Sequence, residues 1–96
     1  MMNLENFLKT YELNLDFFDL DSCLDEIMDI TYQIEVLETN FNHLTKKQQN
    51  KFLLLNGKLL QLLKQVIPKD DLQKKVINKL KEIIKKEKAR QHIKVA

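Results

Sequence analysis

The stretch KFLLLNGKLLQLLKQVI, residues 51–67, decides the fold. Its first apolar set recurs at steps of three and four residues, one stripe of an α-helix, and consists of Phe52, Leu55, Leu59, Leu62 and Val66. A second stripe beside it consists of Leu53, Leu60, Leu63 and Ile67. An apolar sector this wide needs neighbours on more than one side. We therefore expect this helix to be the middle of a bundle, or one wall of a bundle that also receives a partner.

The composition indicates an all-α protein with a single small domain over residues 1–96. The chain has one Gly, one Pro and no Trp, and it is rich in Leu, Ile, Lys, Glu and Gln. These are helix formers, and they leave little turn chemistry for a sheet. A chain of this length buries only roughly two-thirds of its unfolded surface, so its stability depends on well-packed helices or on association.

Periodicity and capping residues predict helices over about residues 3–18, 22–43, 46–67 and 70–91. The second helix has a heptad seam of Leu20, Cys23, Ile27, Ile30, Ile34, Leu37, Phe41 and Leu44. Leu24, Met28, Thr31 and Tyr32 lie off that seam, as edge packing or as part of a contact surface. The short loop before the third helix makes helices two and three an antiparallel pair. The expected fold is an antiparallel helical bundle of three to four helices with coiled-coil-like packing.

Capping signals mark the ends of these helices. Two pairs of residues have the spacing of a capping box: Thr45 with Gln48, and Asp70 with Gln73. Pro68 ends the third helix because it disfavours helical geometry at the residue before it. Asn56-Gly57 is a turn signal, but the three-four stepping passes through it without a change of phase. We therefore expect the third helix to be continuous there.

Charge is divided unevenly along the chain. Residues 1–45 carry ten acids against Lys9, a net −9, and residues 46–96 carry fifteen bases against four acids, a net +11, which together give +2. One interpretation is a basic arm for nucleic acid. The favoured interpretation is that acidic and basic helices pack together, with charges flanking the apolar seam. The C-terminal basic residues include one Arg and no aromatic side chain for base stacking, so nucleic acid is an unlikely partner.

The sequence predicts no enzymatic chemistry. His43 and His92 are far apart, and neither lies three or four residues from a Cys or another His, so no metal ligands and no catalytic residues are expected. The sequence has no phosphate-binding glycine loop, so we expect no cofactor and no small-molecule substrate. The lone Cys23 suits a reducing compartment, and no stretch reads as a signal peptide or a membrane span. We expect a cytoplasmic, non-enzymatic protein.

The excess of apolar residues in the third helix predicts one of two arrangements. Either a groove for an amphipathic helix lies between helices three and four, or the bundle itself or self-association covers the apolar face. Leu53, Leu60, Leu63 and Ile67 would line the groove, and Leu72, Val76, Leu80 and Ile83 of the fourth helix would cover it. A loosely anchored fourth helix would then act as a lid.

The order of these elements resembles the small flagellar export chaperones of the FliT type. The resemblance is carried by the acidic LDEIMDITYQIEVLETNFNHL, the Thr-initiated TKKQQNKFLLLNGKLLQLLKQV and the lysine-rich INKLKEIIKKEKARQHI, within about residues 10–92. The chain departs from that pattern at Pro68, and Ile93 follows His92 where these chaperones often carry a Tyr. The resemblance implies a cytoplasmic chaperone of the bacterial flagellum that holds a helical segment of a client for protein export.

Two other functions fit the sequence. The first is a homo-oligomeric structural or regulatory protein, in which the acidic second helix packs against a basic helix of another copy. The second is a nucleic-acid-binding accessory protein. A stable dimer at low concentration favours the first, and retention on a phosphate matrix with steep salt dependence favours the second.

Overall fold

Four α-helices and a short 3₁₀ turn form the part of the chain that the computed structural model describes. That part is residues 3–20 and 24–95, with side chains described over 3–20 and 25–86. The elements are α1 (Leu4–Asp16), α2 (Leu24–Thr39), the 3₁₀ turn η1 (Phe41–His43), α3 (Lys46–Gln65) and α4 (Asp71–Val95). The predicted all-α bundle is confirmed.

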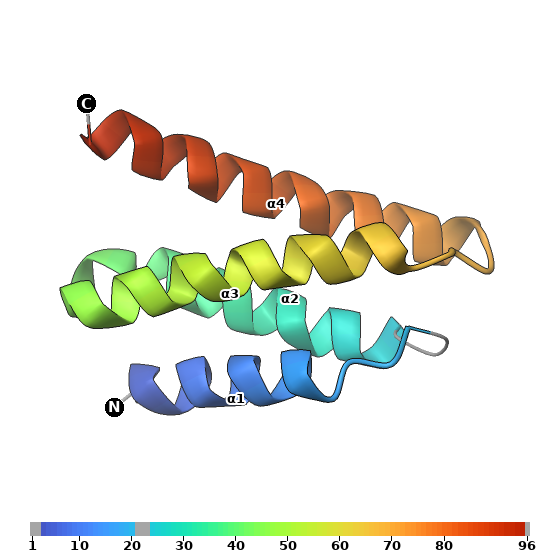
Figure 1. The fold of residues 1–96 in the computed structure, drawn as a ribbon, viewed down its shortest axis with the longest axis horizontal. Coiled ribbons are helices and arrows are strands. Elements are labelled where there is room, and N and C mark those ends of the chain that lie inside the picture. The colour runs from blue at the N-terminus through green and yellow to red at the C-terminus, as the bar shows by residue number, and fades with distance from the viewer. Residues whose placement is uncertain (1–2, 21–23, 96) are drawn as a thin grey trace.

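Consecutive helices run in opposite directions, so α1 and α3 run one way and α2 and α4 the other (Figure 1). The close backbone contacts join α1 to α2 and to α3, and they join α4 to α2 and to α3. Hence α1 and α4 occupy opposite corners of the bundle, and α2 and α3 face each other across its centre. Helices α2 and α3 therefore run antiparallel but lie diagonally opposite each other in the bundle rather than side by side. A consequence for function is that α2 and α4, far apart in sequence, are parallel neighbours.

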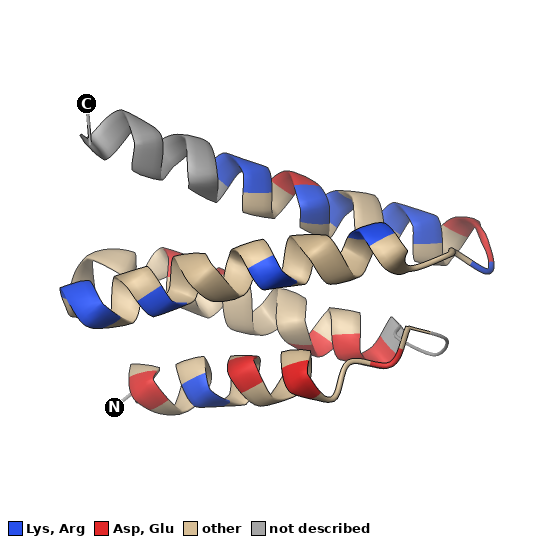
Figure 2. Cartoon of the chain, in the orientation of Figure 1, with Lys and Arg blue, Asp and Glu red and all other residues tan. Residues whose placement is uncertain are grey.

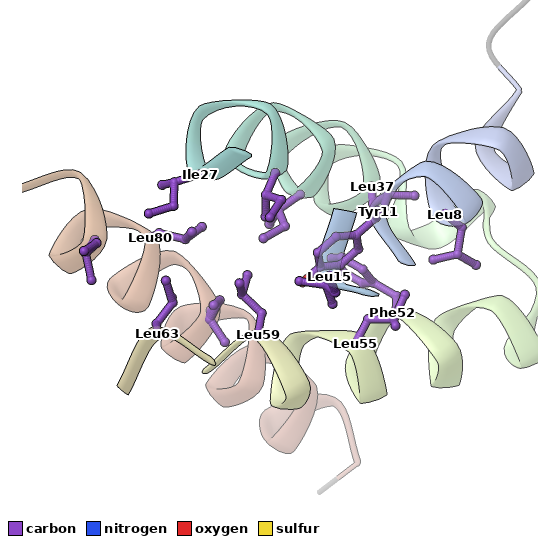
Figure 3. Close-up of a cluster of buried hydrophobic side chains, with 14 of the residues drawn as sticks. Leu8, Tyr11, Leu15, Ile27, Leu37, Phe52, Leu55, Leu59, Leu63 and Leu80 are labelled. Carbon is purple, nitrogen blue, oxygen red and sulfur yellow. The ribbon is translucent and has the colours of Figure 1, made fainter. Parts of the chain in front are cut away.

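The core lies where the four helices meet (Figure 3). Tyr11 of α1 and Phe52 of α3 are both fully buried, and their rings meet edge-on with centroids 6.1 Å apart. Further along the bundle, Ile27, Leu63 and Leu80 bring α2, α3 and α4 together. The first stripe predicted for α3 is buried except for Leu62, which is half-buried. The three-four periodicity of α3 thus identified its buried face correctly.

The second helix ends earlier than its seam predicts. Asn40 follows the last residue of α2, and both its backbone N–H and its side-chain amide donate to the carbonyl of Val36, at 3.1 and 2.8 Å. Phe41 and Leu44 of the predicted seam nevertheless stay buried, because η1 continues toward the core. The predicted start at residue 22, and Cys23 of the seam, lie outside the described residues.

The other helix boundaries differ from the predicted ones by a few residues. The first helix ends at Asp16 rather than residue 18, within the usual variation of helix ends. The third helix ends at Gln65, two residues before the predicted end, because Val66 is already extended at ψ 129° ahead of Pro68. The fourth helix runs from Asp71 to Val95, beyond the predicted residue 91.

Both predicted capping sites are used. The Thr45 hydroxyl accepts from the Gln48 backbone N–H at 3.2 Å, and the Gln48 side chain accepts from the Thr45 backbone N–H at 2.9 Å. Asp70 accepts from the backbone N–H of Gln73 at 2.8 Å. The Gln73 side chain accepts from the N–H of Lys69, one residue earlier than in a capping box. These bonds satisfy orphan donors at the start of α3 and around the start of α4.

The third helix passes through Asn56-Gly57 without a break. Gly57 is exposed, has no positive φ, and a Cβ built on it meets nothing within 4 Å. We expect Gly57→Ala to raise the free energy of unfolding by about 0.5–1 kcal/mol, because alanine lowers the entropy of the unfolded chain. Chemical denaturation measures this. Gly57→Pro is the control and should destabilise by roughly 3 kcal/mol or more. A loss of stability with Ala would contradict a helical Gly57.

Acidic and basic helices do pack together, and they do so between α1 and α3. Glu12 lies 3.1 Å from the ammonium of Lys51, and Asp16 lies 2.9 Å from that of Lys58. Nearer the N-terminal ends of both helices, the Gln48 amide donates to Glu5 at 2.6 Å. Figure 2 shows that the charged residues of α1 are mostly acidic and that those of α3 are basic. These side chains are partly exposed, so each ion pair contributes at most about 1 kcal/mol.

Candidate functional site

The structure distributes the eight residues predicted to form a groove over different parts of the bundle. Leu63 and Leu80 are in the core, with 1% and 0% of their surface exposed. Leu53 and Leu60 are half-buried, as are Val76 and Ile83. Ile67 and Leu72 are exposed, at 83% and 60%. A single surface between α3 and α4 therefore does not contain all eight.

The edges of α3 and α4 explain this separation. Lys51 and Lys58 reach α1 on one edge of α3, and Leu53 and Leu60 lie about 200° further around the helix, on the edge toward α4. On α4 the corresponding apolar edge turns away from α3. Val76 borders a hollow shared with α2, and Leu72 and Ile83 follow its stripe at steps of four and seven residues.

An open groove of about 220 Å³ lies between α2 and α4. It is lined by Met28 and Thr31 of α2 and by Val76, Lys79 and Leu80 of α4. Leu80 is fully buried, so it forms the floor, while Met28 is 60% exposed at the side. The volume is below the roughly 300–1,000 Å³ of small-molecule sites. It suits one or two side chains inserted from a partner.

The two exposed residues that line this groove, Met28 and Lys79, each belong to an exposed helical stripe. We name the first the α2 rim: Asp25, Met28, Tyr32 and Glu35, at steps of three, four and three residues. We name the second the α4 rim: Leu72, Lys75, Lys79, Glu82 and Lys86, which continues the same stepping. All nine residues are exposed. The α4 rim extends over about 21 Å at 1.5 Å per residue, the length of a partner helix of roughly four turns.

Apolar side chains on the rims are unusual in their placement. Met28, Tyr32 and Leu72 are each 60% exposed. The Tyr32 ring contacts Phe7 of α1, with centroids 6.1 Å apart, so it leans toward α1 rather than toward the groove. Exposed apolar residues such as Leu54 also occur singly elsewhere, and these need no explanation. Met28 differs because it adjoins a hollow with a buried leucine floor.

A second hollow of about 480 Å³ lies at the end of the bundle where the α1–α2 and α3–α4 connections meet. It is lined by Leu20, Gln65, Ile67, Pro68 and Lys69. Ile67, predicted for the α3–α4 groove, belongs to this end of the molecule instead.

One polar pair is buried in the core between α1 and α3. The Tyr11 hydroxyl donates to the Asn56 side-chain oxygen at 2.7 Å, and both residues are buried. Burial raises the pKa of Tyr11, so the hydroxyl stays protonated well above its usual range. The Asn56 amide nitrogen has no hydrogen-bond partner among the described atoms. The pair lies apart from the groove and has a structural role.

The described residues contain no group of three or more His, Cys, Asp or Glu side chains that could hold a metal ion. Val76 and Leu80, predicted to cover a groove between helices three and four, line the groove between α2 and α4 instead. Met28, Thr31 and Tyr32 were placed off the seam of the second helix, as edge packing or as part of a contact surface. Sequence reasoning did not join the two sets, because periodicity does not show that α2 and α4 are neighbours.

Comparison with known proteins gives no assignment. No helix in the described part of the chain combines the length and the apolar character needed to cross a membrane. No family model, curated protein or solved structure matches the chain.

Proposed function

We propose that the chain is a non-enzymatic protein-binding module that receives an amphipathic helix in the groove between α2 and α4. The observation that carries the proposal is this groove, with Leu80 buried at its floor and Met28 exposed at its side. An amphipathic helix inserts apolar side chains at helical spacing into such a groove. Binding would cover the apolar part of both rims, which are wet in the free protein.

A narrower form of the proposal is a cytoplasmic export chaperone that holds a helix of a flagellar client. It is supported by the resemblance of the acidic second segment, the Thr-initiated third and the lysine-rich fourth to chaperones of the FliT type. The groove between α2 and α4 replaces the one expected between helices three and four as the binding surface in this proposal. Helix α4 forms one wall of it.

A paired substitution tests where the partner lies. The probe is a helical peptide of about 18 residues with leucines at three-four spacing, long enough to retain helicity. We expect Val76→Asp to weaken its binding at least about tenfold, because a carboxylate in the groove is desolvated by the partner. Leu60→Asp is the matched control, also half-buried but on the α3 edge, and should change the affinity by less than about threefold. Fluorescence anisotropy measures both.

A second variant distinguishes loss of the fold from loss of the binding surface. Met28→Asp changes a side chain that is already 60% exposed, so the variant should keep the wild-type helicity and melting temperature while losing peptide binding. If Leu60→Asp abolishes binding and the two groove variants do not, the partner occupies the α3–α4 surface. If the wild type binds no amphipathic peptide, the proposed function is wrong.

A further inference from the structure

We infer that the partner helix has one acidic edge and one basic edge, an inference that rests on the proposed function. The groove has rims of unlike charge. Asp25 and Glu35 stand on the α2 rim, and Lys75, Lys79 and Lys86 stand on the α4 rim. Glu82 interrupts the lysines but leaves the α4 rim net positive. The apolar floor lies between these two rows.

These rim charges are not used to hold the bundle together. The salt bridges of Glu12 with Lys51 and of Asp16 with Lys58 join α1 to α3. The five rim charges named above form no ion pair within 4 Å with any described residue. In Figure 2 the lysines of α4 lie at the opposite corner of the bundle from the acids of α1. The rim charges are therefore free to interact with a partner.

The groove geometry brings each rim against one edge of a docked helix. A helix whose apolar stripe rests on Val76 and Leu80 turns one flank toward α2 and the other toward α4. Opposite charges attract across each rim, and like charges disfavour the complex. Turning a helix end for end exchanges its two flanks. The unlike rims therefore also fix the direction in which a charge-split helix lies.

The same arrangement disfavours nucleic acid as the occupant. A nucleic-acid backbone is negative along its whole length, and it would attract the lysines of α4 but meet Asp25 and Glu35 on the α2 rim. Val76 and Leu80 between the rims offer phosphate no hydrogen-bond donor. A helix with both charge signs matches both rims and the apolar floor.

Three peptides with the same leucine stripe test the inference. One carries Glu on one edge and Lys on the other, the second carries Glu on both edges, and the third carries Lys on both. At low salt we expect the charge-split peptide to bind about tenfold more tightly than either uniform peptide, since each exposed pair contributes up to about 1 kcal/mol. The difference should shrink as salt is raised toward about 1 M, where the Debye length falls to roughly 3 Å.

Charge reversal on α4 supplies matched variants. The combined change Lys75→Glu, Lys79→Glu and Lys86→Glu makes both rims acidic, so the peptide with Lys on both edges should become the tightest binder. The control combines Lys74→Glu, Lys81→Glu and Lys85→Glu, which alters the net charge equally on the edge of α4 that faces away from the groove. It should keep the wild-type preference for the charge-split peptide.

The other outcomes of these experiments distinguish failure of the charge inference from failure of the proposed function. Equal binding of all three peptides overturns the charge inference and leaves the proposed function standing, whereas absence of binding overturns both. Competition by a DNA oligonucleotide at the same groove assigns the surface to nucleic acid and overturns the inference. Sedimentation could also reveal a dimer that the charge-split peptide does not dissociate. That result would assign the groove to a second copy of the chain and would overturn the inference.

Discussion

Phe52→Ala is expected to lower the free energy of unfolding by about 3–5 kcal/mol, the largest effect of any substitution considered for this chain. Phe52 is fully buried, and its ring centroid lies 6.1 Å from those of both Tyr11 and Phe41. Removing the ring leaves a cavity where α1, α3 and η1 meet. A domain of this size has roughly 5–15 kcal/mol of stability, so the variant loses a large share of it. Urea denaturation of the purified variant measures the loss.

The control for Phe52 is its near neighbour on the same helix. Leu54 is 75% exposed, so Leu54→Ala should change the free energy of unfolding by no more than about 0.5 kcal/mol. The two residues are both large and apolar, and only the orientation of α3 distinguishes them. Equal losses of stability would mean that α3 turns a different face to the core.

The second large effect concerns the buried pair Tyr11 and Asn56. We expect Tyr11→Phe to destabilise by about 1–3 kcal/mol, because it leaves the Asn56 oxygen as well as its nitrogen without a partner. Asn56→Leu alone should destabilise similarly by leaving the tyrosine hydroxyl buried and unpaired. The double variant removes every unsatisfied group and should recover wild-type stability or exceed it. Chemical denaturation of all four proteins forms the double-mutant cycle, and additive losses would contradict the pairing.

The pH dependence of stability gives an independent check on this pair. Burial raises the pKa of Tyr11 in the folded state, whereas tyrosine in the unfolded chain ionises near pH 10. Above that pH the unfolded state binds fewer protons than the folded state, so stability falls as pH rises. Below it this contribution is fully present. Tyr11→Phe should remove this part of the loss, which is seen by comparing both proteins between about pH 9 and 11.

The sequence predicted the burial of side chains better than the neighbours of each helix. Periodicity identified the buried stripe of α3 from Phe52 to Val66 and the seam of α2 from Ile27 to Leu44. Helical spacing depends only on local geometry, so it is visible in the sequence. The end of α2 at Thr39 was missed because the apolar seam continues through η1. Asn56 was missed as a core residue because its partner Tyr11 is 45 residues away.

The candidate site shows the same limit. Consecutive helices were expected to form the groove, which led to Leu53 and Leu60 of the third helix. The structure instead places Val76 beside Met28 and Thr31 of α2. This adjacency follows from the diagonal arrangement of α2 and α3, which depends on the packing of all four helices together. Val76 and Leu80 of α4 were among the predicted site residues, whereas Lys79 and the opposite wall on α2 were not.

The most direct test of the central claim is an NMR titration of the ¹⁵N-labelled protein with the charge-split leucine peptide. We expect chemical-shift changes to concentrate on the groove between α2 and α4, around Met28, Thr31, Val76 and Lys79. The amides around Leu53 and Leu60, on the α3 edge, should change little. Shifts centred on Leu53 and Leu60, or no shifts at saturating peptide, would contradict the assignment of this groove as the binding site.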